Sequence, residues 1–200
     1  MKPIERGEVL GLADYEKIRE PFRARVIAEK KARRIALGPQ ATCVFENRDT
    51  ALMQIQEMLR TERITREGAI LHEIETYNQL VPGDHELSAT VLIEVDEKSE
   101  RETFLFEAKG LDRCFALVID GTRCHGQHDE ARESPDRTTA VHYLKFPLAP
   151  AAEKALRDVL AKSRKPADVT MELVVEHPRY TARTTLSASL VASLAEDLVS

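Results

Sequence analysis

The spacing of apolar residues changes character at the segment VPGD, residues 81–84. Before this segment, apolar residues mostly recur every three or four positions, as they do on one face of a helix. After it, runs rich in β-branched residues alternate with further helical stretches. We therefore expect a helical N-terminal region over residues 1–82 and an α+β sheet region over residues 83–200, joined in one compact unit.

The N-terminal region contains four predicted helices and one extended segment. The pattern predicts a short helix over residues 12–18, a longer helix over residues 21–34 and an extended piece at residues 41–46. A third helix begins near Asp49, which suits an N-cap, and a break at residues 65–68 separates it from a fourth. The last two helices are expected to form a helical hairpin.

The C-terminal region alternates strands and helices. Strands are predicted at residues 87–95, 113–120, 122–125, 139–148, 169–176 and 180–186, and helices at residues 99–109, at residues 151–162 and from residue 187. Asp120 and Gly121 predict a two-residue hairpin turn that places Cys124 opposite Leu117. The resulting fold class is α+β, with a helical N-terminal layer packed on a mainly antiparallel sheet, and the element order permits a ferredoxin-like sheet.

One carboxylate interrupts an apolar helical face in the predicted hairpin. In LMQIQEMLRTERI, residues 52–64, Glu62 falls in the middle of the apolar stripe, and Asn78 occupies a similar place on the next helix. An unpaired carboxylate in an apolar seam is costly, because the seam removes the water that solvates the charge. We therefore expect a cationic partner to reach Glu62.

The expected partners lie on the preceding, strongly basic helix. Arg23, Lys30 and Arg34 share one side of that helix with apolar residues, so an arginine there can bury its stem and bind a carboxylate. We predict that Arg23 or Arg34 pairs with Glu62 and that Asn78 completes the network. Such a network can be a structural ion pair, a site for an anionic ligand such as a carboxylate or phosphate, or a solvated basic face.

Two histidines lie on predicted buried strand faces. His142 alternates with apolar residues in AVHYLKF, and His177 continues the apolar face of residues 169–175. Neither has a neighbour at metal-binding spacing, so the leading interpretation is a core histidine bonded to backbone, with a ligand pocket or a metal as alternatives. If the two strands were neighbours, the histidines could share a site. The segment CHGQH, residues 124–128, could bind a soft metal, but an accidental hairpin tip is the simpler interpretation.

Charge and motif content limit the classes of function. The net charge of −5 argues against a surface built for nucleic acid or anionic membranes. The charged first residues do not resemble a signal peptide and no stretch is long enough to span a membrane, so a cytoplasmic protein is expected. The three cysteines include no CxxC pair. The sequence contains no GxSxG, P-loop or dinucleotide motif, so it indicates no catalytic residue, cofactor or metal.

Five segments together carry a family resemblance. They are FRARVIAEKKARRIALGP, FENRDTALMQIQEMLRTERI, YNQLVP, AVHYLKFPL and HPRY, of which QIQEM and YNxLxP are the most specific parts. These segments resemble the bacterial family DUF3501, a domain of unknown function, over nearly the whole chain. Members of that family are often encoded beside rubrerythrin-like proteins and iron-sulfur oxidoreductases. The resemblance therefore implies a redox or peroxide-stress setting with such a partner, but it implies no catalytic residue.

Two functions from different classes follow as expectations. The first is a non-catalytic accessory or binding protein in a redox or peroxide-stress system. The second is a small-molecule enzyme or sensor with an anion-binding pocket between the helical hairpin and the sheet, lined by Arg23, Arg34, Glu62 and His142. RNA binding through the basic helix is a weaker third possibility, because no aromatic interleaving or binding motif accompanies the charges.

Overall fold

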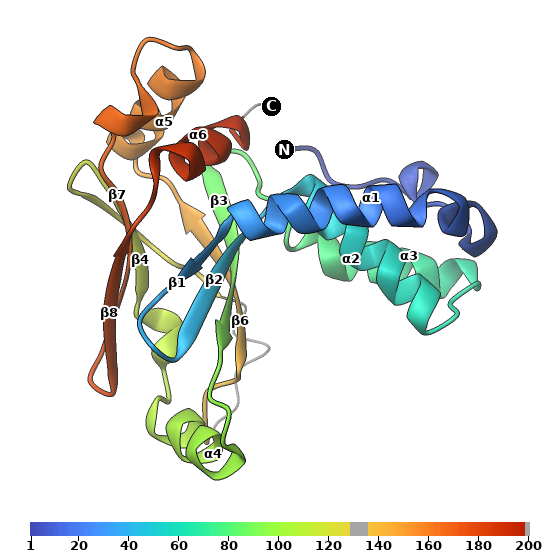
Figure 1. Ribbon diagram of the computed structural model, residues 1–200, viewed down its shortest axis with the longest axis horizontal. Helices are drawn as coiled ribbons and strands as arrows, with labels where there is room; N and C mark the ends of the chain where they lie inside the picture. The colour runs from blue at the N-terminus through green and yellow to red at the C-terminus, as the bar shows by residue number, and fades with distance from the viewer. Residues whose placement is uncertain (129–135, 199–200) are drawn as a thin grey trace.

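Antiparallel strands form two four-stranded sheets that pack face to face (Figure 1). In the computed structural model, which describes residues 1–128 and 136–198, every neighbouring strand pair is antiparallel. The first sheet has the order β1 (Arg34–Ala36), β2 (Ala41–Glu46), β3 (Glu86–Ile93), β6 (Val141–Pro147). The second has the order β5 (Thr122–His125), β4 (Phe115–Ile119), β7 (Met171–His177), β8 (Tyr180–Thr185).

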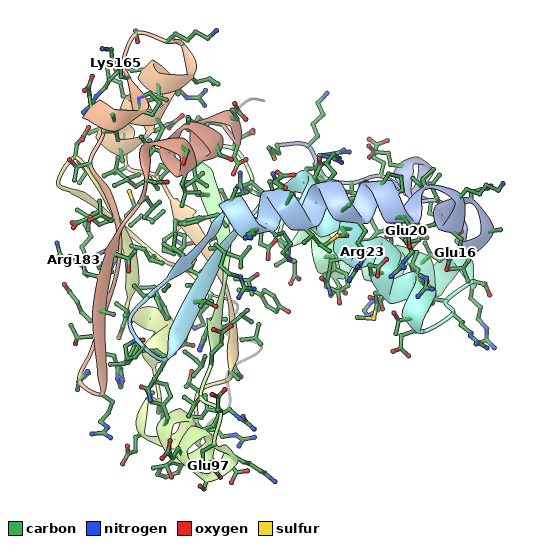
Figure 2. The ribbon with its side chains drawn as sticks, viewed as in Figure 1. Glu16, Glu20, Arg23, Glu97, Lys165 and Arg183 are labelled. Carbon is green, nitrogen blue, oxygen red and sulfur yellow. The ribbon has the colours of Figure 1, made fainter. Side chains whose placement is uncertain are left out.

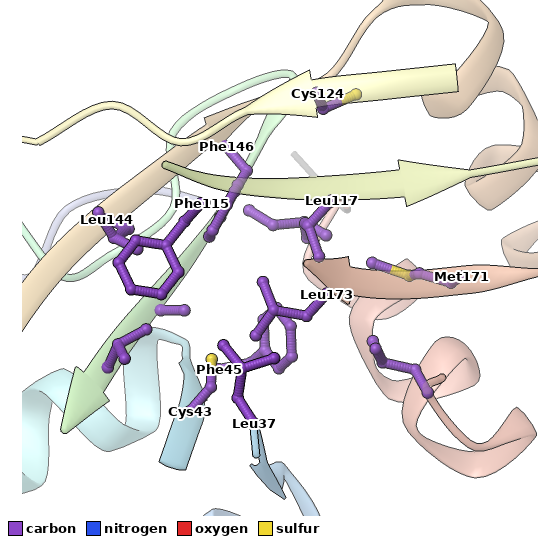
Figure 3. Packing of buried hydrophobic residues seen from close by; sticks show 14 of the residues in the cluster. Leu37, Cys43, Phe45, Phe115, Leu117, Cys124, Leu144, Phe146, Met171 and Leu173 are labelled. Atoms are coloured by element: carbon purple, nitrogen blue, oxygen red, sulfur yellow. The ribbon is translucent and has the colours of Figure 1, made fainter. Parts of the chain in front are cut away.

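The two sheets share one hydrophobic core. Figure 3 shows Cys43 and Phe45 of β2 facing Leu117 of β4 and Leu173 of β7, with Phe146 of β6 beside them. Each of these strands alternates buried and less buried residues, or is buried on both faces where a second layer covers it. Apolar burial between the sheets is therefore the main source of stability for this part of the protein.

The α+β class and the antiparallel pairing are confirmed, but the ferredoxin-like sheet is not. The strands divide between two sheets instead of forming one. The predicted hairpin register is confirmed, because Leu117 pairs with Cys124 across a turn in which Asp120 and Gly121 have φ values of 48° and 80°. Local sequence thus set the turn, whereas the division into sheets depends on pairing between distant segments.

Helices cover the two ends of the sandwich (Figure 1). One end carries α4 (Lys98–Glu107) and the 3-10 turn η2 (Leu111–Arg113); the other carries α5 (Pro150–Leu160), η4 (Pro166–Asp168) and α6 (Ala188–Glu196). Pro150 opens α5, where its missing N–H would have no intrahelical partner in any case.

A tyrosine joins the two sheets at the tip of the β1–β2 hairpin. The hydroxyl of Tyr180 donates to the carbonyl of Leu37, and the N–H of Gln40 donates to the hydroxyl oxygen at 3.1 Å. Gly38 lies between them with φ 72°, and a Cβ atom there would come within 2.6 Å of the hydroxyl oxygen. A side chain at this position would clash with the bond that closes this side of the sandwich.

Three helices form an arm that projects from the sandwich (Figure 1). The helical arm comprises α1 (Leu12–Ala32), α2 (Arg48–Thr61) and α3 (Glu67–Asn78), preceded by the short turn η1 (Arg6–Glu8). It has its own apolar cluster, which includes Ile55, Leu59, Ile70 and Ile74. A helical layer lying on the sheet is therefore not confirmed. Among the described residues, no helix combines the length and apolar character needed to cross a membrane.

Two local features of the N-terminal region differ from expectation. The helices predicted over residues 12–18 and 21–34 are one helix, α1, with Pro21 in its interior on an exposed side, where water can satisfy the carbonyl that the missing N–H leaves. Strands β1 and β2 belong to the N-terminal region, yet β2 pairs with β3. The first sheet thus crosses the division at residue 82, and that division remains a prediction.

Candidate functional site

A cavity of about 910 Å³ lies along strand β6, and we call it the edge cavity. Strand β6 is the last strand of the first sheet, and residues 141–145 line one side of the cavity. The other described walls come from Gln79 at the end of α3, from Glu86 at the start of β3, from the turn at residues 109–113, from Gln127 and His128 after β5, and from residues 137–139. Several segments that are distant in sequence therefore meet at this strand edge.

Within residues 1–128 and 136–198, a short bridge pairs with one end of the β6 edge. Lys145 exchanges two backbone hydrogen bonds with Gln127, at 2.8 and 2.7 Å. The alternation of the strand then sends Val141 and Tyr143 outward and His142 and Leu144 inward. The cavity thus has both an apolar wall and polar groups from one strand.

His142 lies beneath the cavity wall and is 5 % exposed. Its Nε2 has no hydrogen-bond partner within the described residues, and its ring lies 5.9 Å from that of Phe115. Burial lowers the pKa of His142 to about 4, although the nearby carboxylate of Asp112 acts in the opposite direction. The imidazole is therefore neutral at physiological pH.

A second histidine on the cavity wall pairs with a carboxylate. His128 Nε2 lies 3.3 Å from Asp112 Oδ2, and each side chain is 13 % exposed. Both residues line the cavity beside His142. A carboxylate at this distance fixes the orientation of an imidazole ring. The pair could thus present a fixed polar group to a ligand.

Cations outnumber carboxylates on the described walls. The cations are Lys109, Arg113, Arg137 and Lys145, and the carboxylates are Glu86 and Asp112. Lys145 Nζ lies 3.0 Å from Glu86 Oε1. Within the described residues no group of three or more His, Cys, Asp or Glu side chains is arranged to hold a metal ion.

The buried ion pair predicted for Glu62 is wrong. Glu62 is the C-cap of α2 and is exposed, because the helix ends at Thr61 and the chain turns away through Arg63, whose φ is 52°. Arg23 instead lies 3.7 Å from Glu57, and Arg34 lies 3.3 Å from Glu94. Figure 2 shows Arg23 on the helical arm, away from the sandwich.

Replacement of Glu62 is therefore expected to have little effect on stability. An exposed residue without a buried partner changes the free energy of unfolding by about 0.5 kcal/mol or less when truncated. Urea unfolding of Glu62→Ala at pH 7 measures this directly. A loss above about 2 kcal/mol would show that the side chain is buried after all.

The other polar residues of the predicted network have structural contacts. The amide of Asn78 accepts from the N–H of Ile4 at 2.7 Å and donates to the carbonyl of Ile4 at 2.9 Å. Gln56, which the sequence reasoning missed, makes the same two-way contact with Leu10 at 2.7 and 3.2 Å. The two amides thus hold the segment before α1 against the helical arm. The signal for Gln56 was its position beside the apolar stripe of QIQEM.

A buried ion pair does exist, but between residues that were not singled out. Arg33 and Asp197 are 1 % and 2 % exposed, and the guanidinium binds both carboxylate oxygens. Arg33 also donates to the carbonyl of Phe45 at 2.9 Å and to the hydroxyl of Ser193 at 2.9 Å. The pair joins the C-terminal end of α1 to the end of α6. Lys30 lies nearby, 3.8 Å from the buried carboxylate of Glu46.

His177 is bonded to backbone. Its Nε2 lies 3.0 Å from the carbonyl of Lys109, and the N–H of Arg179 donates to its Nδ1 at 3.2 Å. These contacts fix the tautomer with the proton on Nε2. His142 and His177 lie on strands of different sheets, so they do not lie on neighbouring strands. Of the seven residues predicted for a site, His142 alone lines the edge cavity.

The basic helix does not present a free row of cations. Arg19 binds Glu57 through two hydrogen bonds of 2.8 Å, and Arg25 pairs with Asp49. Glu57 also accepts from the hydroxyl of Tyr15 at 2.7 Å. These ion pairs occupy arginine side chains that RNA phosphates would otherwise contact.

Comparisons with known proteins give a family and a structural relative. A crystal structure of a novel protein of unknown function from Burkholderia pseudomallei K96243 is 32% identical, with a TM-score of 0.87 over 99% of this chain and 100% of that one. No curated protein matches. The family model described as a protein of unknown function, DUF3501, matches residues 3–198. This chain therefore belongs to the DUF3501 family.

Proposed function

We propose that this protein binds a small organic molecule in the edge cavity beside β6. The observation that carries the proposal is a cavity of about 910 Å³ into which apolar and polar side chains from several distant segments project. Ligand pockets of small molecules usually occupy about 300–1,000 Å³ and combine an apolar lining with a few polar groups. The edge cavity has both properties.

The polar groups beside the cavity support binding over a plain packing defect. The His128–Asp112 pair is held in a nearly buried position, and His142 keeps a buried ring nitrogen without a partner in the described chain. Buried polar groups cost stability when they lack partners. A gathering of polar groups around one hollow, one of them buried without a partner in the described chain, is typical of a binding site.

The proposed site shares His142 with the predicted pocket between the helical hairpin and the sheet, but Arg23, Arg34 and Glu62 do not line it. Arg23 lies on the helical arm, and Arg34 lies in β1, at the opposite edge of the first sheet from β6. The accessory role in a redox or peroxide-stress system, with a rubrerythrin-like or iron-sulfur partner, rests on the family resemblance alone and remains an expectation.

A cavity-filling substitution tests the proposal. Val141 lines the cavity and is 39 % exposed, so Val141→Trp should place an indole ring in the cavity without disturbing the core. Thr185→Trp adds the same ring at an exposed position of β8 and is the matched control. The parent and both variants would be screened for thermal stabilisation by a metabolite panel, and native mass spectrometry would detect co-purifying molecules.

The expected result is a set of compounds that raise the Tm of the parent and of Thr185→Trp by several degrees. The same compounds should not stabilise Val141→Trp, because the ligand cannot enter a filled cavity. Stabilisation that persists in Val141→Trp would place the ligand elsewhere. Absence of any bound compound by both methods would contradict the proposal.

A further inference from the structure

We infer that the edge cavity selects an organic anion, whose acidic group is attracted by Lys109 and Arg137. This inference rests on the proposed function, because it names the class of ligand for the same cavity. The observations behind it are the charges on the wall, their pairing and the apolar surface between them.

The carboxylates of the wall already have cationic or polar partners. Glu86 lies 3.0 Å from Lys145 and also accepts the N–H of Gly83 at 2.7 Å. Asp112 lies 3.3 Å from His128. Neither carboxylate therefore needs a cationic ligand.

Lys109 and Arg137 carry the surplus positive charge. Neither forms an ion pair with another residue in the described part of the chain, and both line the cavity from separate segments. Cations that converge on a concave surface attract an anion more strongly than isolated surface cations, because the wall excludes part of the screening water. The arginine fork also matches the geometry of a carboxylate or phosphate group.

The apolar wall distinguishes an organic anion from an inorganic ion. Val141, Tyr143 and Leu144 of β6 line the same cavity. A bare phosphate or sulfate ion would leave this surface in contact with water. A ligand with an apolar body and one acidic group can cover this surface while its charge lies near the cations.

Two fluorescent probes with the same apolar body test the inference. The anionic probe is 8-anilinonaphthalene-1-sulfonate, and the uncharged probe is its parent, N-phenyl-1-naphthylamine. Titration of each into the intact protein at low and physiological salt gives their Kd values. We expect the anion to bind at least tenfold more tightly, and this preference should shrink as salt screens the charges.

Charge-removing variants locate the preference. Lys109→Gln combined with Arg137→Gln should raise the Kd of the anionic probe at least tenfold. The Kd of the uncharged probe should stay within about twofold of its parent value, since both replaced side chains are exposed and their loss should not disturb the fold. The matched control is Lys31→Gln combined with Lys165→Gln, which removes the same total charge from exposed positions outside the cavity wall. Figure 2 shows Lys165 near the α5 end of the sandwich. The control should leave both Kd values within about twofold.

The outcomes separate this inference from the proposed function. Loss of probe binding in Val141→Trp would place both probes in the cavity. If they bind there with equal affinity, the anion inference fails and the proposed function stands. The inference would also be overturned if the cavity variant and the control variant raised the Kd of the anionic probe equally, because that result would show only an effect of net charge. If neither probe binds, or if Val141→Trp changes neither Kd, the anion inference fails, and the metabolite screen with Val141→Trp decides the proposed function separately.

Discussion

Asp197→Ala is expected to lower the free energy of unfolding by about 3–5 kcal/mol at pH 7, because it leaves Arg33 as a buried cation without a counterion. Arg33 is 1 % exposed, so water cannot replace the lost carboxylate. The remaining acceptors are neutral groups, such as the carbonyl of Phe45 and the hydroxyl of Ser193. Urea unfolding monitored by circular dichroism measures the difference.

Removal of both charges should cost much less than removal of one. Burial raises the pKa of Asp197 to about 6 even though Arg33 draws it down, so the loss of water around the carboxylate outweighs its attraction to the guanidinium. The double variant Arg33→Met with Asp197→Leu should therefore recover at least half of the stability lost in Asp197→Ala. The carbonyls that Arg33 now satisfies limit the recovery.

An exposed pair serves as the matched control for this experiment. Arg34 and Glu94 lie 3.3 Å apart, with side chains 44% and 49% exposed. Glu94→Ala should cost about 1 kcal/mol or less, because solvent screens such pairs. A similarly small cost for Asp197→Ala would show that water reaches Arg33 and would refute the buried pair.

The comparison of Glu62 with Arg33 shows what the sequence could and could not predict. The rule that a buried charge needs a partner holds for Arg33 and Asp197. The choice of Glu62 was wrong because it assumed that α2 continues past Thr61. One residue at a helix end decides whether a side chain lies in the seam or in water. The partner of Arg33 is 164 residues away, and no local periodicity connects α1 with α6.

Local pattern predicted elements better than it predicted their partners. The turn at Asp120 and Gly121 fixed the register of β4 and β5, since two residues with positive φ specify a two-residue hairpin. Alternation also placed His142 on the buried face of β6. By contrast, alternation identifies a buried face without naming the strand that covers it, so it could not distinguish two packed sheets from one sheet covered by helices.

The edge cavity was beyond sequence reasoning for the same reason. Asp112 and His128 come from separate loops, and their proximity follows from β4 pairing with β5 and from the bridge between Gln127 and Lys145. CHGQH drew attention to His128 as part of a hairpin tip or, less simply, of a soft-metal site, and not as a partner of Asp112. Sites at strand edges depend on which edges a fold leaves uncovered, and that is a property of the whole topology.

The second large effect concerns pH, where His142 and Asp197 are expected to act in opposite directions. Burial lowers the pKa of His142 from 6.5 to about 4, so between these values the unfolded chain binds more protons at this residue than the folded protein. The contribution of His142 to stability is therefore complete above pH 6.5 and is lost as the pH falls toward 4. The shift corresponds to about 3 kcal/mol. Asp197, with its pKa raised from 3.8 to about 6, contributes stability below pH 3.8 that is lost as the pH rises to 6.

These two contributions nearly cancel, so together they should change the parent's free energy of unfolding little between pH 4.5 and 7. Replacing one group at a time should reveal the pH dependence that the other group causes. His142→Phe removes the titrating ring and its partnerless nitrogen at similar size, so relative to the parent it should gain about 2–3 kcal/mol on acidification from pH 7 to 4.5. Arg33→Met with Asp197→Leu removes the opposing group and should lose stability over the same interval. Urea unfolding of the three proteins at both pH values measures these differences. If the free energy of unfolding of His142→Phe changed with pH as that of the parent does, the folded imidazole would gain its proton over the same pH range as the unfolded one. Such a result requires a partner for the ring or access by water.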